Sequence, residues 1–172
     1  MKKKILLTFV GLIGILTVYV CWLTQTSEPK LPMSKEEKAA AAYVESFGYT
    51  IHKRSGKIHT YILEKSFFRS GSGHTPYIQT WSVQGRDPAD FFGKEISGYR
   101  FTVSGHLLDK MYNTHTQIYV MMADGRVIGG TSFPDKDDLV GAPYSIDGRT
   151  LEEVRGISYG EWQKRWGEKY GD

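Results

Sequence analysis

Histidine often supplies acid–base or metal chemistry, and this chain has five. They are His52, His59, His74, His106 and His115. A zinc site usually needs histidines four residues apart on a helix, or histidines combined with paired cysteines. The chain has neither pattern, because its single cysteine is Cys21. We therefore predict no metal ion and no cofactor.

Two groups of carboxylates have spacings that merit a test for catalysis or calcium binding. Asp87 and Asp90 lie at the start of a predicted helical turn, where capping is their simplest role. A glycosidase would need two carboxyl groups about 5 to 10 Å apart across a cleft. The acidic residues Asp135, Asp137 and Asp138 lack the glycine and the distal glutamate of a calcium loop. We predict that neither group is a functional site.

No local catalytic motif stands out in the rest of the sequence. The Gly-Ser-Gly segment at 71–73 lacks the flanking strand and helix of a nucleophile elbow, and no phosphate-binding glycine loop occurs. A cell-envelope hydrolase would have to assemble distant residues, such as His106 or His115 with Asp87. The hydrolase hypothesis requires those side chains to meet in one pocket.

Aromatic residues recur on one face of the C-terminal segment, with lysines on the other side. One interpretation is that both tryptophans pack on the sheet. The functional interpretation is that a basic, aromatic helix contacts the outer leaflet of a membrane or a partner protein. The residues named by this contact hypothesis are Tyr159, Trp162, Lys164, Trp166, Lys169 and Tyr170.

The clearest structural pattern lies between Thr116 and Phe133. Two apolar segments flank Asp124 and Gly125, a pair typical of a type I′ hairpin turn. The predicted pairs are Met121 with Ile128, Val120 with Gly129, and Tyr119 with Gly130. Both faces of the hairpin are apolar, so we place it near the middle of a sheet. Tyr119 is predicted to cover the gaps that the two glycines leave.

Local signals predict the elements before this hairpin. A helix begins at Ser34, whose capping box uses Glu37, and ends at Gly48. Segments 49–53 and 58–64 predict a first hairpin around residues 55–57. A mobile loop is expected at 69–74, and residues 77–83 fit either a helix or a strand.

Further signals frame the rest of the chain. Asp87 is predicted to cap a helical turn that ends at Gly93. Alternation over residues 99–104 predicts a strand with one solvated face. Capping boxes at 150–153 and 158–161 predict two C-terminal helices.

The net charge of the chain comes from its N-terminus. The formal charge is +3, and Lys2, Lys3 and Lys4 precede every acidic residue. Without these three lysines the 22 basic residues become 19, which equals the 19 acidic residues. A neutral domain offers no general phosphate-binding surface, so we predict no nucleic-acid partner.

An uncharged apolar segment runs from Ile5 to Leu23. As a helix it would measure roughly 28 Å, enough to cross the hydrocarbon core of a lipid bilayer. The preceding lysines predict a cytoplasmic N-terminus and an extracytoplasmic remainder. Cleavage of this segment as a signal peptide and lipidation of Cys21 are alternatives, although Tyr19 and Val20 stand where small residues are needed. The predicted organisation is cytoplasmic residues 1–4, a signal-anchor helix at 5–23, a tether at 24–33 and a domain at 34–172.

One longer motif resembles a known family. It reads Gly85-x-Asp87-x-x-x-Phe91-x-Gly93-Lys94-x-Ile96-x-x-Tyr99-x-Phe101-x-Val103, with Phe47-Gly48-Tyr49 before it and Ile128-Gly129-Gly130 after it. This pattern resembles a domain of unknown function found in small extracytoplasmic proteins of Gram-positive bacteria. The resemblance covers roughly residues 34–132 and implies an anchored or lipidated α+β protein with a helix before Gly85. Phe91 replaces an expected tyrosine, and the missing lipidation signal favours a protein anchor.

These patterns predict an α+β fold. We expect an N-terminal transmembrane helix, one helix packed on a mainly antiparallel sheet of about five or six strands, and a C-terminal amphipathic helix. The expected function is a non-catalytic binding or regulatory domain on the outer face of the cell membrane. Its expected partner is an envelope protein, and affinity for wall polymer is a third hypothesis.

Overall fold

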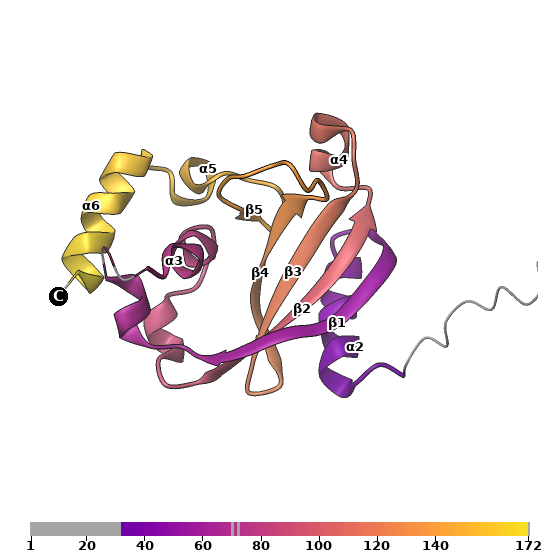
Figure 1. Cartoon of the computed structure of the whole chain (residues 1–172), viewed down its shortest axis with the longest axis horizontal. Helices are drawn as coiled ribbons and strands as arrows, with labels where there is room; N and C mark the ends of the chain where they lie inside the picture. Colours follow the sequence, from indigo (N-terminus) through magenta and orange to yellow (C-terminus); the bar gives the residue numbers. More distant parts are fainter. Residues whose placement is uncertain (1–31, 70, 72, 172) are drawn as a thin grey trace, which may run out of the picture. The chain divides into compact units, whose positions relative to one another are not determined.

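An antiparallel sheet is the frame of the chain, whose computed structural model describes residues 32–69, 71 and 73–171 (Figure 1). The five strands of this described part are β1 (Thr50–Ile62), β2 (Glu95–Ser104), β3 (Thr116–Ala123), β4 (Arg126–Pro134) and β5 (Tyr144–Ser145). They lie in this order across the sheet. The predicted α+β class, antiparallel sheet and C-terminal helix are confirmed.

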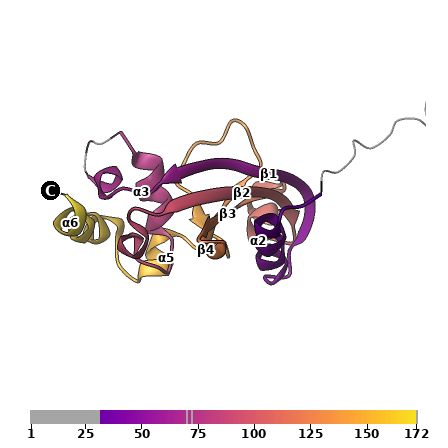
Figure 2. The ribbon, with the colours of Figure 1, turned by 90° about the horizontal axis from the view of Figure 1, so that it is seen from below.

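The helices gather at two places on the sheet. Helix α2 (Lys35–Glu45) lies against one face, and α4 (Leu107–Tyr112) joins β2 to β3. Helices α3 (Thr75–Ser82), α5 (Leu151–Arg155) and α6 (Tyr159–Tyr170) lie together at the end of the sheet away from α2 (Figures 1 and 2). Two short 3₁₀ helices, η1 (Lys65–Phe68) and η2 (Pro88–Phe91), complete the described elements.

The β3–β4 hairpin forms at the predicted turn. Asp124 and Gly125 have φ values of 52° and 70°, which are the positive values that a type I′ turn needs. The predicted register was wrong by one residue, because Met121 pairs with Gly129 while Met122 pairs with Val127. Ile128 is the extra residue of a β-bulge. The bulge keeps each apolar side chain on its predicted face.

Two apolar clusters cover the two faces of this hairpin, as predicted. Ala40 and Val44 of α2 pack on Phe101, Ile118 and Val120 in the first cluster. The second cluster joins the α3–α6 end to the sheet and includes Phe68, Trp81, Ile96, Met121, Ile128 and Tyr170. Burial on both faces makes the hairpin the centre of the fold.

The predicted first hairpin was wrong, because residues 50–62 form one long strand. Strand β1 pairs with β2 from Thr50–Ser104 to Ile62–Glu95. Gly56 has a φ of 70°, but it lies at an irregularity of the ladder and not in a turn. A positive φ at glycine is compatible with both a hairpin turn and a strand irregularity. Here the continuous pairing of β1 with β2 favours the strand.

The predicted helix caps and the helix before Gly85 are largely present in the fold. Residues 75–82 are helical, as the resemblance implied. Asp87 caps η2 through Ala89 N, and the Thr150 capping box is complete. The boxes at Ser34 and Ser158 are half formed, since Glu37 pairs with Arg54 and Glu161 with Arg165. On β2 the expected solvated face is only partly exposed.

The predicted anchor at residues 5–23, the lysines before it and most of the tether lie outside the described residues. Among residues 32–69, 71 and 73–171, no helix is long and apolar enough to span a bilayer. From Met33 onward the described chain forms one compact unit.

Candidate functional site

The sheet face opposite α2 carries a groove of about 470 Å³, which we call the sheet groove. Its apolar and aromatic walls are formed by Ile58, Tyr61, Pro76, Tyr77, Phe133 and Pro143. Its other lining residues are His59, Thr80, Arg100, Gln117, Tyr119 and Thr131. Strands β1 to β4 form the floor, and α3 forms one wall.

Strand periodicity places the polar side chains in this groove. Arg100 pairs with Tyr119, and Tyr119 pairs with Thr131, so the three form a row across β2, β3 and β4. Their neighbours Phe101 and Ile118 point to the opposite face and pack against α2. A local alternation in sequence therefore becomes a row of side chains from three strands.

The ring of Tyr119 crosses β2 above Gly98. A Cβ atom at Gly98 would lie 2.2 Å from the Tyr119 hydroxyl, so a side chain at this position would displace the Tyr119 ring. The prediction that Tyr119 covers Gly129 and Gly130 was wrong. Gln84 fills the space at Gly129, whereas the Tyr119 backbone oxygen and Ile146 lie next to Gly130.

A histidine–tyrosine contact lies on the floor of the groove. The Tyr119 hydroxyl is 2.8 Å from His59 Nδ1 and also contacts Nε2. Burial lowers the pKa of His59 below 6.5, so its ring is neutral at neutral pH and one ring nitrogen can accept a hydrogen bond from the Tyr119 hydroxyl. The pair offers hydrogen bonds to a ligand without adding charge.

Arg100 is the permanent cation of the groove. It is exposed, and its Nε is 3.4 Å from the Ser55 hydroxyl. Within the described chain, no carboxylate lines the groove and Arg100 has no ion pair. An apolar ligand that carries an anionic group fits this combination.

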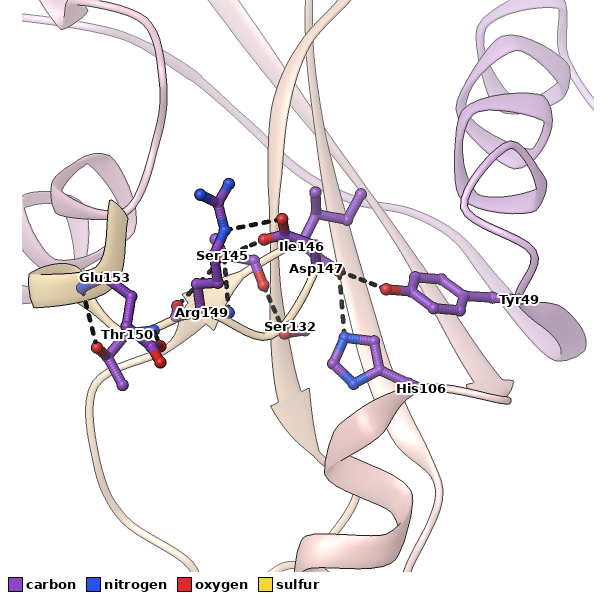
Figure 3. Close-up of polar contacts among 9 residues, drawn as sticks. All are labelled: Tyr49, His106, Ser132, Ser145, Ile146, Asp147, Arg149, Thr150 and Glu153. Carbon is purple, nitrogen blue, oxygen red and sulfur yellow. Dashed lines mark hydrogen bonds and ion pairs between the residues drawn. The ribbon is translucent and has the colours of Figure 1, made fainter. Parts of the chain in front are cut away.

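The side chains named for a hydrolase do not meet. His106 is buried and caps α4, with Nδ1 accepting from Leu108 N at 3.1 Å. Its Nε2 lies 3.2 Å from Ile146 O (Figure 3). His115 lies beside His52 and not beside Asp87, with 4.9 Å between the centroids of the two histidine rings. Asp87 instead accepts hydrogen bonds from Lys169 and Tyr170. The requirement that the hydrolase hypothesis placed on these side chains is therefore not met.

Asp87 has a structural role beside α6. Burial disfavours its ionised form, but hydrogen bonds from Lys169, Tyr170 and Ala89 N outweigh that effect and lower its pKa to about 2. The carboxylate joins the end of α6 to the cap of η2. Asp87 thus forms the predicted cap. It also contacts Lys169 and Tyr170 of α6, which residue spacing in the sequence did not predict.

The residues of the contact hypothesis have unequal exposure. Trp162 and Tyr170 are 6% and 3% exposed, so the domain itself covers them. Trp166 is half-buried between these two rings, with centroid distances of 4.9 Å and 4.6 Å. Tyr159 is 55% exposed, and Lys164 and Lys169 also reach solvent. Packing accounts for the inner rings, and the outer residues are accessible to a partner.

A second hollow of about 520 Å³ lies between α3, α5 and α6, and we call it the helix cleft. Its lining includes Gln79, Glu152, Tyr159, Trp162, Gln163 and Trp166. Helix α3 separates the two hollows, because Tyr77 and Thr80 line the sheet groove while Ile78 and Gln79 line the helix cleft. The described residues contain no cluster of three or more histidine, cysteine or acidic side chains that could hold a metal ion.

Sequence reasoning missed the lining of the sheet groove. Arg100 was predicted on a solvated strand face and Tyr119 on a hairpin face, but their neighbours depend on strand register. His59 belongs to a strand that was predicted as half of a hairpin. The available signal was the alternation of polar and apolar residues, which gives a face and not its cross-strand contacts.

Comparison with known proteins gives no relative from which a function could be transferred. No protein-family model, curated protein or solved structure matches this chain. Membership in the resembled family therefore stays a prediction, and function has to be inferred from the two hollows.

Proposed function

We propose that this chain is a single-pass membrane protein whose folded domain is a binding or regulatory module outside the cell membrane. The apolar segment from Ile5 to Leu23 would be the anchor, and Lys2, Lys3 and Lys4 would keep the N-terminus in the cytoplasm. Residues 24–33 would tether the domain to the membrane surface.

The sheet groove is the proposed binding site. Ligand sites commonly measure roughly 300 to 1,000 Å³ and combine apolar walls with a few polar groups, and this groove of about 470 Å³ has that character. Arg100 supplies a cation, while His59 and Tyr119 supply hydrogen bonds. This combination is the observation that carries the proposal.

The proposed ligand is an apolar segment of another envelope protein with a carboxylate beside its apolar side chains. Arg100 can bind the carboxylate through a charge-assisted hydrogen bond, and the ring-lined walls can cover the apolar side chains. None of the described residues that line the groove is acidic, so none would repel such a segment.

Photo-crosslinking in cells tests this site in the full-length protein. A photoreactive phenylalanine replaces Ile58, which lines the groove and is 37% exposed. The same residue at Lys38, an exposed position of α2 that does not line the groove, is the matched control. We expect one dominant envelope protein to be captured from position 58 and not from position 38.

A second variant shows whether capture depends on the groove. Arg100→Ala should reduce the yield of that product at equal expression, because it removes the only permanent charge among the described residues that line the groove. The proposal fails if position 58 captures nothing, if both positions capture the same proteins, or if Arg100→Ala leaves the yield unchanged.

A further inference from the structure

The helix cleft differs from the sheet groove in its chemistry. Its rings form a continuous series along α6, with centroids 6.0 Å apart for Tyr159–Trp162 and 4.9 Å apart for Trp162–Trp166. Tyr159, at one end of the series, is 55% exposed, whereas Trp162 in the middle is 6% exposed and Trp166 at the other end is half-buried. The cleft therefore offers aromatic surface that extends from solvent into the domain.

Polar groups line the same cleft, and none of its described lining residues is basic. Gln79 lies on α3, Gln163 on α6 and Glu152 on α5. None of these three side chains has a hydrogen-bond or ion-pair partner within the part of the chain that the structure describes. Among the described residues that line the cleft, Glu152 is the only charged one. Two amides and one carboxylate are thus available to a ligand.

We infer that the helix cleft binds a neutral saccharide chain. The C–H face of a sugar ring can pack on an aromatic ring, while its hydroxyl groups exchange hydrogen bonds with amide and carboxylate side chains. A phosphate or uronate would find no cation among the described residues that line the cleft and would face Glu152. If the domain lies outside the membrane as proposed, the wall polymer would present such chains to it.

Tryptophan fluorescence tests this inference in the full chain. A Trp22→Phe background leaves Trp162 and Trp166 in the cleft and Trp81 in the core as emitters. The protein is kept in a polyoxyethylene detergent, because sugar-headed detergents would compete. We titrate it with a β-1,4-linked N-acetylglucosamine tetramer and with cellotetraose, and expect saturable binding of at least one, with a Kd of about 1 mM or tighter.

Variants at exposed lining positions locate the binding. Tyr159→Ala and Gln163→Ala should each weaken it roughly 3- to 10-fold, because one removes a ring and the other an amide. Lys164→Ala changes the next exposed residue of α6, which does not line the cleft, and should leave affinity unchanged. Arg100→Ala should also have no effect, which separates this inference from the proposed role of the sheet groove.

Three outcomes would overturn the saccharide site. They are no saturable signal with either sugar, equal binding by Tyr159→Ala, Gln163→Ala and the parent protein, or tighter binding of polygalacturonate than of both neutral sugars. Circular dichroism of each variant shows that the fold is retained.

Discussion

At the scale of single residues, the Gln84 side chain hydrogen-bonds to the backbone of β4 as a neighbouring strand would. Its side chain is 3% exposed and forms two bonds with the Gly130 backbone: Nε2 donates to Gly130 O, and Gly130 N donates to Oε1, each at 3.0 Å. A Cβ at Gly129 would lie 2.2 Å from Oε1. The pair fixes the end of α3 on β4, and α3 is a wall of both hollows.

Gly129→Ala should therefore destabilise the domain by about 1 to 3 kcal/mol, because the new methyl group displaces Gln84 and leaves buried polar groups without partners. The matched control is Gly160→Ala, since a Cβ there meets nothing within 4 Å and the site is helical. That change should be neutral or stabilise by up to about 1 kcal/mol. Urea unfolding measures both, and equal midpoints for the two variants would contradict the role of Gln84.

His106 makes stability depend on pH. Burial lowers its pKa below 6.5, although the Ile146 carbonyl, Asp109 and Asp147 act in the opposite direction. As the pH falls, the His106 ring therefore becomes protonated at a higher pH in the unfolded chain than in the folded chain. The His106 contribution is fully present above about pH 6.5 and is lost as pH falls below it, by at most about 1.4 kcal/mol per pH unit.

His106→Asn should flatten the fall of the unfolding free energy between about pH 6.5 and 5, because asparagine can still cap α4 but does not titrate. His59→Gln is the control, because this ring is less buried than that of His106 and should account for less of that slope. Urea unfolding at several pH values is the measurement. An unchanged slope in His106→Asn would show that other groups cause the dependence.

At the scale of elements, α6 is attached by its inner rings and presents its outer ones. Trp162 packs with Val83 and Leu151, while Tyr170 belongs to the cluster that contains Phe68 and Trp81. The hydroxyl of Tyr170 also donates to Asp87. One aromatic face thus serves both packing and the helix cleft.

Trp162→Ala should lower the unfolding free energy by about 3 to 5 kcal/mol, because it leaves a large cavity under α6. Tyr159→Ala removes a ring that is 55% exposed and should change it by no more than about 0.5 kcal/mol. Thermal or urea unfolding compares the two variants. If Trp162→Ala were as stable as Tyr159→Ala, the Trp162 ring would not be part of the core. That result would support the contact hypothesis for Trp162.

At the scale of the whole molecule, the proposed topology depends on the uneven distribution of charge. The three N-terminal lysines account for the net charge of +3, and the remaining chain is neutral. Positive charge beside an apolar span favours the cytoplasmic side, so the domain should lie outside.

Labelling of intact cells measures this topology. Lys164→Cys places a thiol at an exposed position of α6, and Cys21→Ser removes the only native thiol. A membrane-impermeant maleimide should label this variant in intact cells. Lys3→Cys in the same background should be labelled only after lysis. The reverse pattern would contradict the proposed orientation.

The sequence by itself determined features that join residues close in the chain. The turn at Asp124 and Gly125 needs two adjacent residues with positive φ, and the Thr150–Glu153 capping box needs two side chains three positions apart. The alternation of apolar residues also gave the faces of β3 and β4. Spacing is sufficient for these features because the interacting groups are local.

Only the tertiary structure decided which distant residues meet. It paired β1 with β2 along its length, placed Tyr119 over Gly98 and put α3 between the two hollows. The bulge at Ile128 shifted the predicted register by one residue without changing the predicted faces. Such contacts depend on how the whole core packs, because many pairings satisfy the same alternation and only one of them fills both faces of the sheet.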